Sequence, residues 1–587
     1  MSDPLPSGAR AGDGLAEGQG KACKAAECLI DVLAEAGVPH IFGVVGGAVV
    51  PIVRATGGRR AQIVVARHEA GAALMADGYA RVSGGLGACV ANSGPGTTNL
   101  IAGVACAYAD SIPIVVLTGQ AATKPCGKGT LPESGGEGVN SVDLLKCMTR
   151  YSAVVSRADL LLGMWQTALR AATGGRPGPV HLCLPADVQE QTVQVEGWTR
   201  PTLHRTKTHD RDAIKQAAGR LLRARQPAIL AGHGAVLSGA AEEIRGIAEM
   251  LDIPVATTAK GKGVFPEDHR LSLGPFGYSG SPLAQWYLLE GGADVLLAVG
   301  TSLSEWGTMG WDRRLQPSEA LLHVDVDPYE IGKTYRAAVP LIGDAKSVLT
   351  ELSYEIRRLR GNIRPVAGRE RCFEPPPERL RFRDAAAMES AAVPIKPQRL
   401  IRDLQDALPR DTLVFVDGGA NRAWAIHYWQ AFYPRTFFCA TAKAAMGYGV
   451  AAAIGGKFAA PDRVVVCIAG AGGFLMSGME VSTAVRHNKQ VIWIVLNPVG
   501  PGAAHHALRT INLPAVGMPY ARVDCARVAE ALGAQGISLR EPGQINRELI
   551  GRIVEGGRPT VLDVETDPNE AEAFQGPLAG LGNVFDG

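Results

Sequence analysis

The expected fold of this chain follows from one stretch, Val464-Val465-Val466-Cys467-Ile468-Ala469-Gly470-Ala471-Gly472-Gly473. An uninterrupted run of apolar residues is typical of a strand buried on both faces, as in a parallel sheet. The glycines lead into a helix-like segment, Phe474 to Arg486, and glycine amides ahead of a helix can cradle a phosphate. The stretch therefore predicts a strand, a phosphate-compatible turn and a helix, the repeating unit of a parallel α/β sheet.

The same alternation of strand-like runs and helix-length segments recurs along the chain in three blocks. We predict an α/β fold of three parallel-sheet domains. The predicted divisions are a disordered N-terminus at 1–20, domains at 21–195, 213–354 and 397–567, a charged, proline-rich linker at 357–396 and a C-terminal tail at 568–587. The predicted strands are His40–Phe42, Gln62–Val65, Ala88–Val90, Ile112–Leu117 and Pro179–Leu182; Pro227–Leu230, Ile253–Val255, Val295–Val299 and Leu322–Asp327; Leu413–Asp417, Val464–Ile468, Val491–Leu496 and Thr560–Val564.

Composition narrows the class of protein. The 587 residues exceed what one core usually holds, and 46% are hydrophobic, which is enough to bury several cores. A net charge of +2 gives no electrostatic reason to expect nucleic acid or an anionic membrane as partner. No long apolar run suggests a membrane span. The cysteines form no CxxC pair and no basic-then-apolar leader is visible, so we expect a cytoplasmic protein.

Motifs in the first and third blocks stand in a characteristic order. The first block carries Phe42-Gly43-Val44-Val45-Gly46-Gly47, Ala66-Arg67-His68-Glu69-Ala70-Gly71-Ala72, Asp77-Gly78-Tyr79-Ala80-Arg81, Ser93-Gly94-Pro95-Gly96-Thr97-Thr98-Asn99 and Thr118-Gly119-Gln120. The third block carries Ala445-Met446-Gly447-Tyr448-Gly449, Gly472-Gly473-Phe474-Leu475-Met476-Ser477-Gly478-Met479-Glu480 and Thr483-Ala484-Val485-Arg486-His487-Asn488.

In this order the motifs resemble those of thiamine diphosphate enzymes of the acetohydroxyacid (acetolactate) synthase and pyruvate oxidase group. The resemblance covers nearly the whole chain. It implies a pyrimidine-binding first domain, a central second domain and a diphosphate-binding third domain. It also implies a small-molecule substrate and a homodimer or homotetramer, because the family builds its cofactor site between two subunits.

The resemblance also implies roles for individual residues. Glu69 corresponds to the catalytic glutamate that protonates the aminopyrimidine ring of the cofactor, which then supplies the reactive carbon. Met446 corresponds to the bulky residue that keeps the cofactor bent, and the carbonyl of Ala444 to the one that accepts its amino group. The further cofactor-binding residues implied are Gly94, Pro95 and Gly96 in the first block and Gly472, Gly473 and Asn497 in the third.

Departures from the family pattern gather at the diphosphate end. Ala471 stands where the family has an aspartate, and Pro498 follows Asn497 where it has a second asparagine. Mg²⁺ prefers oxygen ligands in octahedral geometry, and neither substituted side chain offers one. The segment that usually touches the diphosphate is changed to Gly419-Ala420-Asn421-Arg422. We therefore predict no metal ligand here and a doubtful role for Mg²⁺.

Lys443 adds a charge where the family has a small, uncharged stretch. One hypothesis is that Lys443, together with Arg422, supplies positive charge in place of the metal. Another is that Lys443 projects into a vacated thiamine pocket and blocks it, and the simplest alternative is a lysine whose ammonium lies in solvent. The residues alone leave all three open.

The central block resembles the domain that holds FAD in acetohydroxyacid synthases and pyruvate oxidases, through Gly261 to His269 and His323 to Pro328. The segment Gly300 to Trp306 departs from the flavin-contacting pattern, so FAD is one possibility. The Gly-rich, acidic loop Gly129 to Asn140 stands where carboligating relatives carry a bulky residue, which makes a different substrate plausible.

Two functions follow. The first is an acetolactate synthase-like enzyme that makes or breaks a C–C bond next to the carbonyl of a 2-oxo acid-type substrate through thiamine diphosphate, with an atypical metal site. The second is a repurposed member without thiamine chemistry, either a flavin-dependent oxidoreductase or a non-catalytic partner subunit. The motif around Glu69 favours the first function, and Ala471 and Pro498 favour the second.

Overall fold

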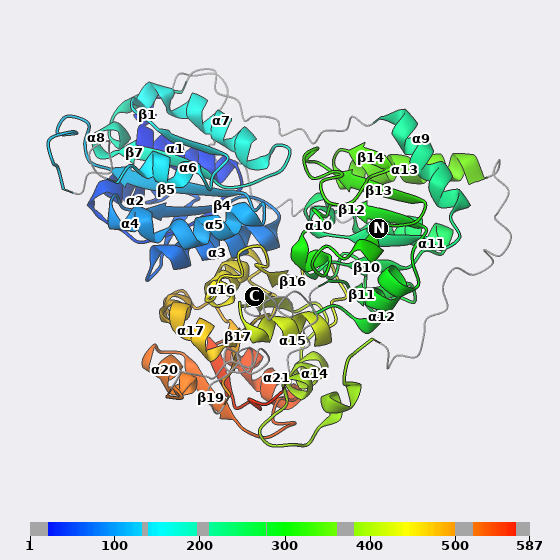
Figure 1. The fold of residues 1–587 in the computed structure, drawn as a ribbon. Coiled ribbons are helices and arrows are strands. Elements are labelled where there is room, and N and C mark those ends of the chain that lie inside the picture. The colour runs from blue at the N-terminus through cyan, green and yellow to red at the C-terminus, as the bar shows by residue number, and fades with distance from the viewer. Residues whose placement is uncertain are drawn as a thin grey trace, which may run out of the picture. The chain divides into compact units, whose positions relative to one another are not determined.

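A computed structural model describes residues 22–131, 139–195, 210–277, 279–360, 381–498 and 521–570. Outside the described residues lie the predicted disordered N-terminus, half of the predicted linker, most of the predicted C-terminal tail and the centre of the loop Gly129 to Asn140. The chain divides into two compact units, one of residues 1–80 and 85–203, the other of residues 81–84 and 204–587. The ribbon in Figure 1 is coloured along the chain from blue at the N-terminus to red at the C-terminus.

The first unit is built on a six-stranded parallel sheet with the order β3-β2-β4-β5-β7-β6. Its strands are β2 (His40–Gly43), β3 (Gln62–Val65), β4 (Gly87–Ala91), β5 (Ile114–Gln120), β6 (Tyr151–Val154) and β7 (Val180–Pro185). A small antiparallel pair joins β1 (Ala22–Lys24) to β8 (Thr192–Gln194). The helices are α1 (Ala25–Glu35), α2 (Val50–Ala55), α3 (Glu69–Ser83), α4 (Pro95–Asn99), α5 (Ile101–Ala109), α6 (Ser141–Lys146), α7 (Leu161–Thr173) and α8 (Ala186–Gln189).

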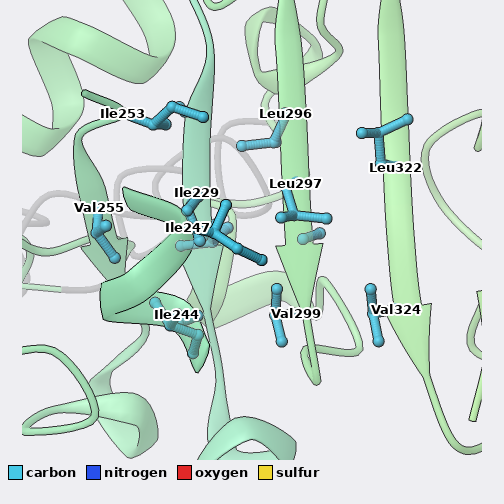
Figure 2. Packing of buried hydrophobic residues seen from close by; sticks show 14 of the residues in the cluster. Ile229, Ile244, Ile247, Ile253, Val255, Leu296, Leu297, Val299, Leu322 and Val324 are labelled. Carbon is cyan, nitrogen blue, oxygen red and sulfur yellow. The ribbon is translucent and has the colours of Figure 1, made fainter. Parts of the chain in front are cut away.

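The second unit contains two further six-stranded parallel sheets. The central sheet has the order β11-β10-β9-β12-β13-β14. Its strands are β9 (Ala228–Ala231), β10 (Val255–Thr257), β11 (Ser272–Pro275), β12 (Val295–Val299), β13 (Ala320–Asp325) and β14 (Val339–Ile342), and its helices include α9 (Arg211–Arg223), α10 (His233–Ser238), α11 (Ala241–Leu251), α12 (Pro282–Gln285) and α13 (Ala345–Arg360). Figure 2 shows its core, with Ile244 and Ile247 of α11 beside buried residues of the strands.

The third sheet has the order β16-β15-β17-β18-β20-β19. Its strands are β15 (Leu413–Val416), β16 (Phe437–Cys439), β17 (Val465–Gly470), β18 (Ile492–Leu496), β19 (Gln535–Leu539) and β20 (Thr560–Val564). The helices are α14 (Pro397–Ala407), α15 (Ala420–Tyr428), α16 (Tyr448–Ala459), α17 (Ala471–Ser477), α18 (Val481–Arg486), α20 (Cys525–Ala531) and α21 (Arg547–Gly556). The prediction of three parallel-sheet α/β domains is confirmed.

The described ends of the predicted linker pack onto the second unit. Residues 357–360 still belong to α13. Further along, the guanidinium of Arg381 donates to the carbonyl of Glu267 at 2.7 Å, and the hydroxyl of Tyr428 donates to the carbonyl of Arg383 at 2.7 Å. None of the helices within the described ranges combines the length and apolar character that crossing a bilayer requires.

A buried histidine in the first sheet gives a prediction for acid stability. His181 on β7 lies between two hydroxyls, with 2.8 Å from Nε2 to Thr118 Oγ1 and 2.8 Å from Nδ1 to Ser152 Oγ. The Ser152 hydroxyl donates to the carbonyl of Val142, so it accepts from His181 and the proton of the ring is on Nδ1. Burial lowers the pKa of His181 to about 3, because a charged imidazolium would be desolvated.

Below the ordinary histidine pKa, about 6.5, the unfolded state therefore binds more protons than the folded state. The free energy of unfolding decreases as the pH is lowered from about 6.5 towards about 3. We expect His181 to cost about 2 kcal/mol at pH 5 relative to pH 7. Chemical denaturation of the parent and of His181→Gln over pH 5 to 7 measures this cost as the difference between their pH slopes. Equal slopes in the two proteins would contradict the prediction.

Candidate functional site

The site is expected where each parallel sheet reverses its strand order, because ligands bind outside the carboxyl ends of strands at such a switch point. In the third sheet the chain runs from β15 to β16 on one side and returns to β17 on the other. Gly418 and Gly419 follow β15, and Gly470 to Gly473 form the junction between the end of β17 and the start of α17. They flank the switch point with backbone that carries almost no side chains.

Gly472 and Gly473 are close to two other residues of this edge. A Cβ on Gly473 would be 1.8 Å from Oδ2 of Asp417, and one on Gly472 would be 3.2 Å from Cε of Met446. Gly473 is buried and Gly472 is exposed. The structure thus brings together Met446, Gly472 and Gly473, and shows that Gly473 has no space for a side chain.

Asp417 is a site residue that the sequence reasoning missed. It is fully buried, and its carboxylate accepts hydrogen bonds from the backbone N–H of Gly447 at 3.0 Å and of Gly449 at 2.9 Å. Burial raises the pKa of Asp417 to about 6, against the opposing effect of these N–H groups and of Arg422. Asp417 anchors the start of α16 beside Gly473, and its only sequence signal is a charge at the end of an apolar run.

Asn421, on the first turn of α15, connects the two strands of the switch point. Its side-chain amide donates to the carbonyls of Asp417 at 2.9 Å and Ile468 at 3.1 Å. A Cβ on Gly419 or Gly470 would be 3.3 or 3.4 Å from its Oδ1. Asn421 therefore places an amide oxygen beside the glycines of both turns.

Asn497 follows β18 and is bound to its own domain. Its buried side-chain amide donates to Oδ1 of Asp563 at 2.9 Å and to the carbonyl of Val523 at 2.9 Å. The other carboxylate oxygen of Asp563 accepts from the N–H of Cys525 at 3.0 Å, and burial raises the pKa of Asp563. The side-chain nitrogen of Asn497 therefore donates both of its hydrogen bonds within its own domain. By the family resemblance, the backbone carbonyl near Gly500 is the one metal contact that the sequence keeps as a candidate, and it lies outside the described residues.

The loop that carries Lys443 extends along the switch point. Ala444 has a φ of +52°, which is strained for a residue with a side chain. A Cβ on Gly418 would be 2.7 Å from the Ala444 carbonyl oxygen. Since Met446 of the same loop reaches Gly472, the loop spans both turns. Lys443 is exposed and forms no ion pair with another described residue.

The predicted residues of the first unit also come together. Glu69 begins α3 and is 9% exposed. Its Oε2 accepts from the side-chain amide of Asn99 at 2.9 Å, and a Cβ on Gly96 would be 3.2 Å from its Oε1. Gly94 has a φ of +66° and Pro95 begins α4. The carboxylate is thus held in one orientation at the carboxyl edge of the first sheet.

The switch point of the central sheet is between β9 and β12. There the N–H of Gly234 donates to the carbonyl of Gly300 at 2.8 Å, and a Cβ on Gly232 would be 2.5 Å from the same oxygen. An amide in the first turn of α10 is therefore used within the protein rather than left for a phosphate. FAD stays a prediction for this domain.

The described residues suit the aminopyrimidine end of thiamine diphosphate. They do not suit a Mg²⁺ ion at its diphosphate end. A buried, oriented carboxylate such as Glu69 suits a nitrogen of the aminopyrimidine ring. At the diphosphate end, Ala471 and Pro498 provide no side-chain oxygen, although Mg²⁺ requires oxygen ligands. Among the residues that the structure describes, no three His, Cys, Asp or Glu side chains gather in a group that could hold a metal ion.

Comparisons with known proteins agree with the division of the chain into three parallel-sheet domains. Family descriptions match as "Thiamine pyrophosphate enzyme, N-terminal TPP binding domain" over residues 23–137, "central domain" over 214–352 and "C-terminal TPP binding domain" over 417–564. A probable acetolactate synthase large subunit of Methanocaldococcus jannaschii is 35% identical over 579 residues, covering 96% of this chain and 95% of that protein.

Two bacterial proteins are similar to nearly the same extent. The acetolactate synthase isozyme 3 large subunit of Escherichia coli is 32% identical, with coverage of 93% of this chain and 95% of its own length. A putative acetolactate synthase large subunit of Mycobacterium tuberculosis is 32% identical, with coverage of 89% and 93%. The chain therefore belongs to the thiamine pyrophosphate enzyme family, as a relative of the acetolactate synthase large subunits.

Proposed function

We propose that this enzyme makes or breaks a C–C bond next to the carbonyl of a 2-oxo acid-type substrate with thiamine diphosphate, at a site whose metal and diphosphate contacts are altered. The observation that carries the proposal is the buried carboxylate of Glu69, held by Asn99 and bordered by Gly96. The names of its relatives support the acetolactate synthase-like assignment.

The roles of this chain's own residues follow from their contacts. Thiamine diphosphate, when bound, supplies the carbon nucleophile that such a reaction needs. Glu69 would hold a proton at its carboxylate towards the ring of that cofactor, with Asn99 fixing the orientation. Ala444 would offer its carbonyl, and Met446 would contribute apolar bulk beside Gly472. We further propose a homodimer or homotetramer, because the chain resembles a family that builds its cofactor site between two subunits.

Glu69→Gln is the variant that tests this function. It keeps the shape of the side chain and can still pair with Asn99, but it cannot exchange a proton, so we expect turnover of pyruvate or another 2-oxo acid to fall roughly 100-fold. The measurement is 2-oxo acid consumption with saturating thiamine diphosphate, together with calorimetric titration of the cofactor.

The matched control is Glu242→Gln, which changes an exposed glutamate of α11 in the central domain. It should leave turnover unchanged. Full activity in Glu69→Gln would disprove the assigned role. If the parent protein bound no thiamine diphosphate in any buffer, the assignment would shift to a flavin-dependent or non-catalytic member of the family.

A further inference from the structure

Three described acidic side chains of the third domain are hydrogen-bonded within the protein. Asp417 accepts from Gly447 and Gly449 with its two oxygens. Asp563 accepts from Asn497 and Cys525 in the same way. Glu480, in the turn that follows α17, is buried and accepts from the hydroxyl of Thr483 at 2.7 Å. Each of these carboxylates would have to abandon a buried hydrogen bond to serve a cation, and an unpaired buried donor is unfavourable.

Asp417 is also fixed in position by its packing. Its Oδ2 lies against Gly473, at the place where a Cβ would be 1.8 Å away. Rotation of the carboxylate towards solvent would remove the acceptors of both glycine amides at the start of α16. Asp417 is therefore not available to replace the ligand that is absent at Ala471.

Positive charge is present at the same edge. Lys443 is exposed, in a loop whose Ala444 carbonyl lies over Gly418 and whose Met446 side chain reaches Gly472. No described carboxylate within 4.0 Å neutralises its ammonium. Arg422 is buried, with its guanidinium carbon 5.3 Å from the ring centre of Trp306, and its charge already acts on Asp417. Among the described residues, Lys443 therefore presents at this edge an exposed ammonium that forms no ion pair and can meet an anionic ligand.

We infer that this chain holds the diphosphate of its cofactor without a divalent cation, with the ammonium of Lys443 as the counter-charge. The inference rests on the proposed function, since it concerns the same ligand. A buried diphosphate needs compensation by charge or by charge-assisted hydrogen bonds. Lysine supplies a compact point charge with three donors, which suits phosphate oxygens.

Calorimetric titration of thiamine diphosphate, in buffer with excess Mg²⁺ and in buffer with EDTA, tests the inference. We expect the two dissociation constants of the parent to agree within about 2-fold. Lys443→Met should weaken binding roughly 10- to 100-fold, because one charge-assisted contact is lost. Unphosphorylated thiamine serves as the second probe, and its affinity should not change in Lys443→Met because it lacks the diphosphate.

Two further variants sharpen the experiment. Lys215→Met removes an exposed lysine from α9 of the central domain and should leave both affinities as they are. The double variant Ala471→Asp, Pro498→Asn provides oxygen ligands at the two changed positions, and we expect it to bind thiamine diphosphate more tightly with Mg²⁺ than with EDTA, by at least about 10-fold.

The outcomes separate this inference from the proposed function. Binding by the parent in Mg²⁺ that is lost in EDTA overturns the inference alone and leaves the proposed function standing. Unchanged diphosphate affinity in Lys443→Met overturns the role of that lysine. Failure of the parent to bind thiamine diphosphate in both buffers overturns the proposed function, and the inference with it.

Discussion

Replacement of Lys262 by Met is expected to lower the free energy of unfolding of the second unit by about 3–5 kcal/mol, the usual cost of removing one partner of a buried ion pair. The Nζ of Lys262 is 2.6 Å from Oε1 of Glu267, with side-chain exposures of 0% and 6%. The ammonium also donates to the carbonyl of Ile426 at 3.1 Å. Lys262→Met would leave the Glu267 carboxylate buried without its counter-charge.

The pair links two domains of the second unit. Lys262 and Glu267 follow β10 of the central sheet, whereas Ile426 belongs to α15 of the third sheet. Glu267 also accepts from the N–H of Ala431 at 3.3 Å. Burial raises the pKa of Glu267, and the nearby Lys262 opposes that rise. Loss of the lysine therefore favours protonation of Glu267. It also removes the hydrogen bond to the Ile426 carbonyl, which helps to position α15 and with it Asn421 and Arg422.

Guanidinium denaturation at pH 7 measures the effect. A double variant, Lys262→Met with Glu267→Gln, should recover much of the lost stability, because no charge then remains buried. Lys346→Met serves as control, since its contact to Glu243 is a surface pair at 3.8 Å and such pairs contribute at most about 1 kcal/mol. A loss in Lys262→Met no greater than that of the control would refute the prediction.

The second large effect is expected at Asp417, for which Asp417→Ala should cost about 3–5 kcal/mol at pH 7. The substitution leaves the N–H groups of Gly447 and Gly449 buried without an acceptor, at about 1–3 kcal/mol each, and it opens a cavity beside Gly473. Thiamine diphosphate affinity should fall as well, because the loop with Ala444 and Met446 loses its anchor. Asp462→Ala, an exposed position before β17, is the control.

The pH dependence of this deficit has a definite sign. The pKa of Asp417 is raised from 3.8 to about 6, so between these values the folded state binds more protons than the unfolded state. The contribution of the carboxyl group to stability therefore falls as pH rises through this window and is constant above it. We expect the deficit of Asp417→Ala to be about 2 kcal/mol larger at pH 4.5 than at pH 7. A deficit that shrinks on acidification would contradict the burial of this carboxyl group.

Much of the site was accessible from local patterns. The family resemblance assigned Glu69 and Gly94 to Gly96 to the same cofactor, and in the structure a Cβ on Gly96 would be 3.2 Å from Oε1 of Glu69. Met446 also lies beside Gly472, where a Cβ would be 3.2 Å from its Cε, while the roles of these residues in cofactor binding stay predictions. Asp417 escaped notice because its importance depends on amides that lie thirty and thirty-two residues away in sequence. The Lys262–Glu267 pair escaped notice for a related reason, since burial of a charged pair is decided by packing between domains and has no periodic signature.

The sequence by itself determined the class of fold, the family and the interior strands. Those strands are covered on both faces, so their apolar runs are visible without any knowledge of neighbours. Of the six strands at the edges of the three six-stranded sheets, only β3 was predicted, and β6, β11, β14, β16 and β19 were missed. Edge strands pair on one side only and carry mixed composition, such as Gln535–Leu539, so their pairing follows from the sheet that they join. Tertiary structure alone decided these edges, the anchoring of α16 by Asp417 and the hydrogen bonds that hold the Asp563 carboxylate, because each depends on contacts between residues distant in sequence.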